Sequence, residues 1–79
     1  MSAIDDAVEL AWMNGAQVTS QRGAFAAIFT RLGLCVSGPV NGGGYRVRWY
    51  DVNGAEATET FRDPLTAIER AIALQEEIQ

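Results

Sequence analysis

The stretch from Tyr45 to Gln79 reads YRVRWYDVNGAEATETFRDPLTAIERAIALQEEIQ and predicts two β-strands followed by an α-helix. Its first six residues alternate between the two faces of a strand, with Tyr45, Val47 and Trp49 on the apolar face. Asp63-Pro64 predicts the helix start, because aspartate caps helices well and proline suits the first helical position. We therefore expect a β-hairpin with the C-terminal helix packed on it.

Two hairpin loops are compatible with the sequence between the strands. A two-residue loop, Asn53-Gly54, would place Arg46 opposite Phe61. A three-residue loop, residues 52–54, would place Tyr45 opposite Phe61. We favour the longer loop, because a slip of one residue moves every side chain to the other face and only this register gathers the aromatic residues.

The favoured register has one cost on the apolar face. Glu59 lands there beside Val47, while Trp49 lies opposite the small Ala57. A carboxylate in such a place must either reach the edge of the sheet or pair with an arginine. The sequence leaves these two alternatives open.

Upstream, the sequence predicts two helices and one short strand. The first helix spans Ala3 to Met13, capped by Ser2 and ended by Asn14-Gly15. The second spans about Gln21 to Leu32. The apolar stripes expected to be buried are Ile4, Val8, Ala11 and Trp12 on the first helix and Phe25, Ile28, Phe29 and Leu32 on the second.

A strand is expected at residues 34–37, ended by Gly38-Pro39 or confined by them to an edge of the sheet. The expected fold is therefore a single α+β domain over residues 1–79. It has two N-terminal helices, a small antiparallel sheet of two or three strands, and a C-terminal helix on the sheet. The expected core is Val47, Trp49, Phe61, Ile68 and Ile72, joined by Trp12, Phe25 and Phe29.

The composition is acidic and lacks the residues of common catalytic sites. The 79 residues include ten acidic side chains, six basic ones that are all arginine, and no histidine, for a net charge of −4. Without histidine or lysine there is no imidazole base, Schiff-base amine or lysine phosphate loop. The single cysteine, Cys35, cannot form a zinc site alone and is expected to be a small buried residue. We expect a non-enzymatic protein without cofactor or metal.

Two features of the chain bear on its compartment. No apolar run approaches the ~18 residues of a membrane span, and the N-terminus MSAIDDAVEL lacks the basic segment of a secretory signal. One cysteine allows no internal disulfide. These features favour a reducing cytoplasm. The absence of lysine beside abundant alanine, glycine and arginine suggests a GC-rich bacterial or phage genome, and hence a bacterial host cell.

The Y-R-V-R-W-Y strand, D-V-N-G turn and Asp-Pro helix start resemble the arm-type DNA-binding domain of phage tyrosine integrases and, more loosely, the plant AP2 domain. The resemblance covers less than half of the chain. It implies a sheet whose outer face enters the DNA major groove through Arg46, Arg48, Tyr50, Glu56, Thr58 and Thr60. Glu56 departs from that use because it would meet phosphates with like charge, and the second strand lacks the family's basic residues.

In size, acidity and lack of catalytic residues, the chain is also similar to the small anti-CRISPR proteins of phages and prophages. This similarity implies an inhibitor that covers a basic, nucleic-acid-binding surface on a protein partner, such as a CRISPR effector subunit. The residues expected to contact the partner are Asp5, Asp6, Glu9, Tyr50, Asp51, Glu56, Glu69, Glu76 and Glu77. The alternative is an accessory domain that binds DNA through Arg46 and Arg48. The sequence does not predict the oligomeric state.

Overall fold

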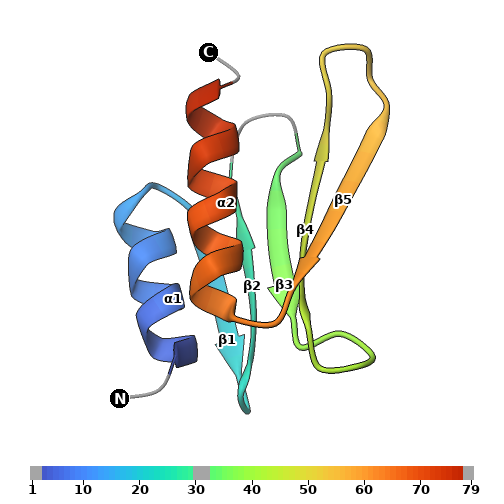
Figure 1. Cartoon of the computed structure of the whole chain (residues 1–79). Helices are drawn as coiled ribbons and strands as arrows, with labels where there is room; N and C mark the ends of the chain where they lie inside the picture. Colours follow the sequence, from blue (N-terminus) through green and yellow to red (C-terminus); the bar gives the residue numbers. More distant parts are fainter. Residues whose placement is uncertain (1–2, 30–32, 78–79) are drawn as a thin grey trace.

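The computed structural model describes residues 3–29 and 33–77, which form a small α+β domain (Figure 1). The elements, in order, are α1 (Ala3–Met13), β1 (Gln17–Gln21), β2 (Ala24–Ile28), β3 (Cys35–Gly38), β4 (Tyr45–Tyr50), β5 (Glu56–Phe61) and α2 (Pro64–Glu77). The strands form one antiparallel sheet in the order β1-β2-β3-β4-β5.

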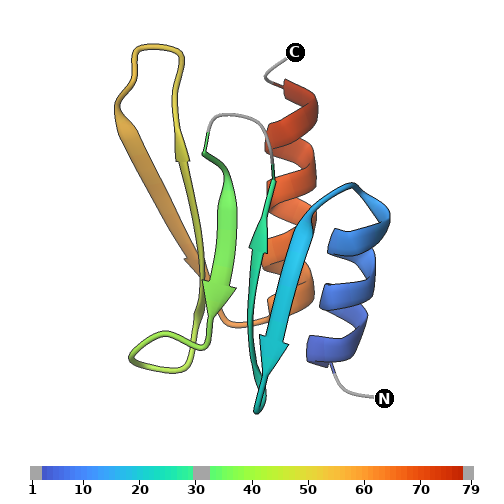
Figure 2. The ribbon, with the colours of Figure 1, turned by 180° about the vertical axis from the view of Figure 1, so that it is seen from behind.

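The molecule has two layers, with both helices on the same face of the sheet (Figures 1 and 2). Helix α1 packs on β1 and β2, α2 packs on β3, β4 and β5, and the two helices contact each other. They run in the same direction, so their N-terminal ends lie at the same end of the molecule (Figure 1). No helix in the described part of the chain covers the opposite face of the sheet.

The expected architecture of two N-terminal helices and two or three strands is wrong. Residues 17–28, assigned in part to a second helix, form the β1–β2 hairpin instead. Phe25 and Ala27 are buried while Ile28 is exposed, which is the period of a strand and not of a helix. The described sheet therefore has five strands, and Leu32, expected at the end of that helix, lies outside the described residues.

The first hairpin is closed by a two-residue turn, Arg22-Gly23, between the paired residues Gln21 and Ala24. Arg22 has φ 51° and Gly23 has φ 79°. Two consecutive positive φ angles characterise the type I′ turn, whose twist matches that of an antiparallel hairpin. Asn-Gly is the usual sequence signal, and the arginine in its place obscured the turn.

Replacing Gly23 with alanine is expected to lower the free energy of unfolding by about 1 kcal/mol, because an L-residue resists a positive φ. A Cβ there meets no atom within 4 Å, so the cost lies in the backbone alone. In a helix the same change would raise stability by about 1 kcal/mol. Urea denaturation of Gly23→Ala distinguishes the loss of stability expected for the hairpin from the gain expected for a helix. Arg22→Asn should raise the stability only if the hairpin is present, because type I′ turns favour asparagine at this position.

The strand expected at residues 34–37 exists as β3, shifted by one residue, and lies at the centre of the sheet. It pairs with β2 on one side and β4 on the other. Gly38 is its last residue, so the Gly38-Pro39 pair ends the strand without confining it to an edge.

The β4–β5 hairpin has the predicted three-residue loop and register. Tyr45 pairs with Phe61 and Trp49 with Ala57. Asp51 Oδ1 accepts hydrogen bonds from the backbone N–H of Asn53 (2.8 Å) and of Ala55 (3.0 Å), which fixes the turn.

Both alternatives hold for Glu59, because β5 is an edge strand of the sheet and the carboxylate also pairs with an arginine. Glu59 Oε1 lies 2.9 Å from Nε of Arg70 on α2. Both side chains are more than a third exposed, so solvent screening limits the pair to about 0–1 kcal/mol. The contact nevertheless satisfies the one carboxylate that the register places on the helix-covered face.

The helix boundaries agree with the sequence analysis. Helix α2 begins at Pro64, and the backbone N–H of Leu65 donates to Asp63 Oδ1 at 3.0 Å, as expected for an N-cap. Helix α1 spans the predicted residues, and Gly15 follows it with φ 88°. Ser2, the expected cap of α1, lies outside the described residues.

The core lies between the helices and the sheet and includes Phe25, Phe29, Leu34, Val36, Tyr45, Val47, Ile68 and Leu74. The expected core residues Trp49, Phe61 and Ile72 are partly buried against it. Trp12 is the exception, with 73% of its surface exposed. Helix α1 instead turns the small Ala7 and Ala11 toward the sheet, and this places Trp12 at the side of the helix.

Candidate functional site

The helix layer carries a set of exposed carboxylates. Six of the expected contact residues are exposed on α1 and α2, and we call them the helix-layer acids: Asp5, Asp6, Glu9, Glu69, Glu76 and Glu77. The only basic residue within these two helices is Arg70, which is paired with Glu59 from the sheet. The outer surface of the helix layer is therefore strongly negative.

Two of these acids border an apolar depression between the helices. This interhelix depression has a volume of about 250 Å³ and is lined by Asp6, Glu9, Leu10, Met13 and Leu65. Met13 is 76% exposed, so a flexible apolar side chain is available beside the two carboxylates. An apolar centre with a charged rim is the usual composition of a protein-binding surface.

The uncovered side of the sheet, which we call the open face, has a different character. Arg46, Arg48 and Tyr50 of β4 are exposed there, next to Thr60, Thr58 and Glu56 of β5 in that order. The ring of Tyr50 packs over Gly33, where a Cβ would lie 2.9 Å from Tyr50 Cδ2. Within the described part of the chain, neither arginine forms an ion pair.

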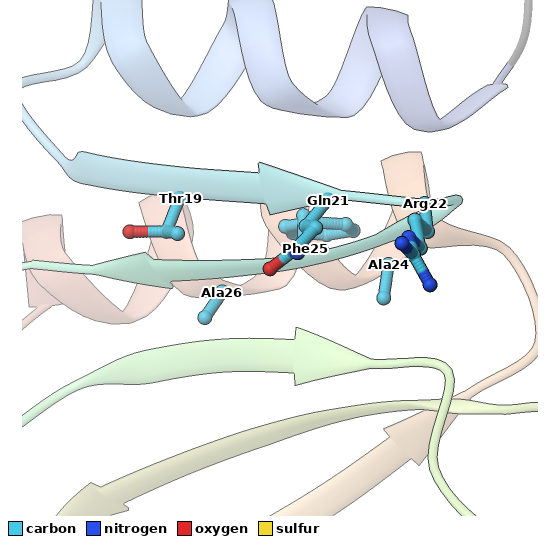
Figure 3. A pocket seen from close by; sticks show the side chains of 6 residues that line it. All are labelled: Thr19, Gln21, Arg22, Ala24, Phe25 and Ala26. Atoms are coloured by element: carbon cyan, nitrogen blue, oxygen red, sulfur yellow. The ribbon is translucent and has the colours of Figure 1, made fainter.

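Small side chains form the middle of the open face. Ser37 and Cys35 of β3 pair with Arg46 and Arg48, so the cysteine is half-buried on this face and not in the core. A shallow depression of about 450 Å³ lies beside them over the first hairpin (Figure 3). It is lined by Thr19, Gln21, Arg22, Ala24, Phe25 and Ala26.

The structure thus separates the nine expected contact residues into three groups. The helix-layer acids lie on one side of the molecule, and Tyr50 and Glu56 lie on the open face. Asp51 lies in the β4–β5 turn, where one carboxylate oxygen already accepts two backbone hydrogen bonds. A single flat partner surface cannot contact all three groups.

Sequence reasoning missed the apolar residues that accompany the acids. Met13, Leu10 and Leu65 line the interhelix depression, and Trp12 is exposed at the side of α1. The signal in the sequence is the pair Ala7 and Ala11, four residues apart, because alanines on the buried stripe allow a helix to lie close to a sheet. The larger side chains of α1, Leu10, Trp12 and Met13, then lie outside the buried face of the helix.

Among residues 3–29 and 33–77, no group of three or more histidine, cysteine, aspartate or glutamate side chains is arranged to hold a metal ion. No helix in these same ranges is both long enough and apolar enough to cross a membrane. Comparison of the chain with protein-family models, with curated proteins and with solved structures gives no match.

Proposed function

We propose that this protein is a non-enzymatic inhibitor that binds a basic surface of a protein partner through its helix layer. The observation that carries the proposal is the interhelix depression, where Asp6 and Glu9 stand beside the exposed Met13. Apolar contacts at the centre of an interface supply affinity, and charges at its rim supply orientation and association rate. The net charge of −4 also attracts the chain to a basic surface, over a longer range than the direct contacts.

The proposed mechanism is occlusion. A surface built to hold nucleic acid presents lysine and arginine side chains, and the helix-layer acids would occupy them in place of phosphates. The small size and acidity of the chain support an inhibitor of the anti-CRISPR type, acting on an effector subunit in the bacterial cytoplasm. Complex formation should weaken as salt rises, because rim charges are screened over about 8–10 Å at physiological ionic strength.

A matched pair of charge reversals tests the surface. Glu9→Arg on α1 and Glu56→Arg on the open face both change one exposed glutamate and shift the net charge equally. We expect Glu9→Arg to reduce capture of an effector subunit from a CRISPR-bearing host lysate about tenfold. Glu56→Arg should stay within about twofold of the unmodified protein. Equal effects of the two variants, or capture that ignores salt, would contradict the proposal.

A second candidate function is nucleic-acid binding by the open face. The specific observation in its favour is that Arg46 and Arg48 are exposed on an uncovered sheet and lack ion-pair partners in the described ranges. This arrangement differs from a solvated face in which arginines are neutralised by cross-strand acids. It would supply two phosphate or base contacts from adjacent positions on one face of β4.

Fluorescence anisotropy with a short DNA duplex at low salt tests this second function. Binding should fall steeply with salt and be lost in Arg46→Ala/Arg48→Ala, because each phosphate contact releases counterions. The control is Arg62→Ala, which removes an exposed arginine outside the sheet. Absence of binding at low salt would dismiss the open face as a nucleic-acid surface.

A further inference from the structure

Strand β1 is an exposed edge of the sheet, and nothing in its sequence protects it. Among residues 3–29 and 33–77 it pairs only with β2, and its residues, QVTSQ, include no charge and no proline. Natural sheets usually guard an edge with lysine, proline or a bulge, because unpaired backbone groups recruit another strand. The opposite edge, β5, contains two glutamates, Glu56 and Glu59.

The backbone groups that β1 presents outward follow from its pairing. Gln21 and Ala24 flank the two-residue turn, so they form the hydrogen-bonded pair that closes the hairpin. Hydrogen-bonded pairs alternate with non-hydrogen-bonded ones along an antiparallel ladder. The N–H and C=O groups of Val18 and Ser20 therefore point away from β2, toward the open edge.

A groove runs beside this edge, between α1 and β1. This edge groove has a volume of about 380 Å³ and is lined by Val8, Trp12, Ala16, Gln17 and Val18. Its lining has no charged side chain, and the largest apolar surface belongs to the exposed Trp12. A helix beside an unpaired strand is the arrangement that accepts an added peptide strand, with backbone bonds to the strand and side chains against the helix.

We propose that β1 and α1 together bind an extended segment of a protein partner, which adds to the sheet as a sixth strand. Alternate apolar side chains of that segment pack against Trp12 and Val8. The chain has a net charge of −4, so charge complementarity favours a segment with a lysine or arginine beside its apolar residues. The edge groove is separate from the interhelix depression and binds this segment whether or not that depression has a partner.

A second copy of this chain fits the edge less well. The β1 strand of a second copy, QVTSQ, offers a single apolar side chain and no cation. Two chains that each carry a net charge of −4 also repel each other.

The test uses a displayed library of random eight-residue peptides selected on the full chain. Enriched peptides are expected to combine alternate apolar residues with at least one lysine or arginine. Ser20→Pro removes an outward N–H without touching the β1–β2 bonds, so it should weaken these peptides at least tenfold. Ser20→Ala keeps that N–H and should bind as the unmodified protein does. Trp12→Ala should weaken binding about tenfold.

Amide hydrogen exchange supplies a second readout on folded protein. A selected peptide should slow exchange at Val18 and Ser20 and leave Thr19 unchanged. No enriched peptide, enrichment of acidic peptides, or binding that survives both Ser20→Pro and Trp12→Ala would overturn the proposal. A dimer in light scattering that Ser20→Pro dissociates would also overturn it, by assigning the edge to a second copy.

Discussion

Replacing Phe29 with alanine is expected to lower the free energy of unfolding by about 3–5 kcal/mol. The side chain is only 2% exposed and is among the largest fully buried ones in the core. Its backbone N–H also donates to the C=O of the buried Leu34 at 2.9 Å, which ties the end of β2 to the start of β3. Small domains have a total stability of about 5–15 kcal/mol, so the loss is a large fraction of it.

The neighbouring Ile28 provides the matched control. It precedes Phe29 in the chain but lies on the open face, 54% exposed. Ile28→Ala should therefore cost less than about 1 kcal/mol. Thermal unfolding should show a midpoint lowered by at least about 12 °C for Phe29→Ala and by a few degrees for Ile28→Ala. Equal losses would mean that both side chains are buried, as in the helix first expected here.

Replacing Gly38 with alanine is expected to cost about 1–3 kcal/mol through steric overlap. Phe25 on β2 and Tyr45 on β4 stack with ring centroids 5.6 Å apart, although β3 runs between their strands. They can meet because Gly38, opposite Phe25 on β3, has no side chain. A Cβ there would lie 2.5 Å from Tyr45 Cδ2 and 2.9 Å from the Gly44 carbonyl oxygen.

A double-mutant cycle with Tyr45→Ala isolates this overlap. Removing the Tyr45 ring eliminates the shorter contact, so Gly38→Ala should cost less in that background by at least about 0.5 kcal/mol. Chemical denaturation of the four proteins measures the coupling. Strict additivity would show that the cost of the alanine does not arise from the ring.

The sequence predicted the β4–β5 register and the start of α2. The turn after Asp51 admitted two loops, and the need to gather the aromatic residues on one face selected the correct register. Asp63-Pro64 indicated the start of α2 directly.

The helix predicted for residues 21–32 was wrong because two patterns fit the same apolar residues. Phe25, Ile28 and Phe29 have the spacing of a helical stripe, whereas Phe25 and Phe29 also have the even spacing of one face of a strand. With arginine at the first turn position, no Asn-Gly signal identified the hairpin.

The candidate site was predictable in its residue types but not in its geometry. The positions of the acids on α1 and α2 follow from the helix boundaries. The outer-face positions of Tyr50 and Glu56, away from the C-terminal helix, were also predicted. The β1–β2 hairpin was not, so the sequence did not show that α1 packs on the same face of the sheet as α2. Trp12 was placed in the core because it continues the spacing of Val8, whereas the helix buries its alanines.

One measurement tests most directly whether the helix layer, and not the open face, binds the partner. Three baits are compared in capture from a CRISPR-bearing host lysate: the unmodified protein, Asp6→Asn/Glu9→Gln/Glu69→Gln, and Arg46→Ala/Arg48→Ala. We predict that the arginine variant recovers an effector subunit as well as the unmodified protein, whereas the acid variant recovers less than about a tenth as much. Undiminished recovery by the acid variant, or no effector subunit with any bait, would contradict the proposed function.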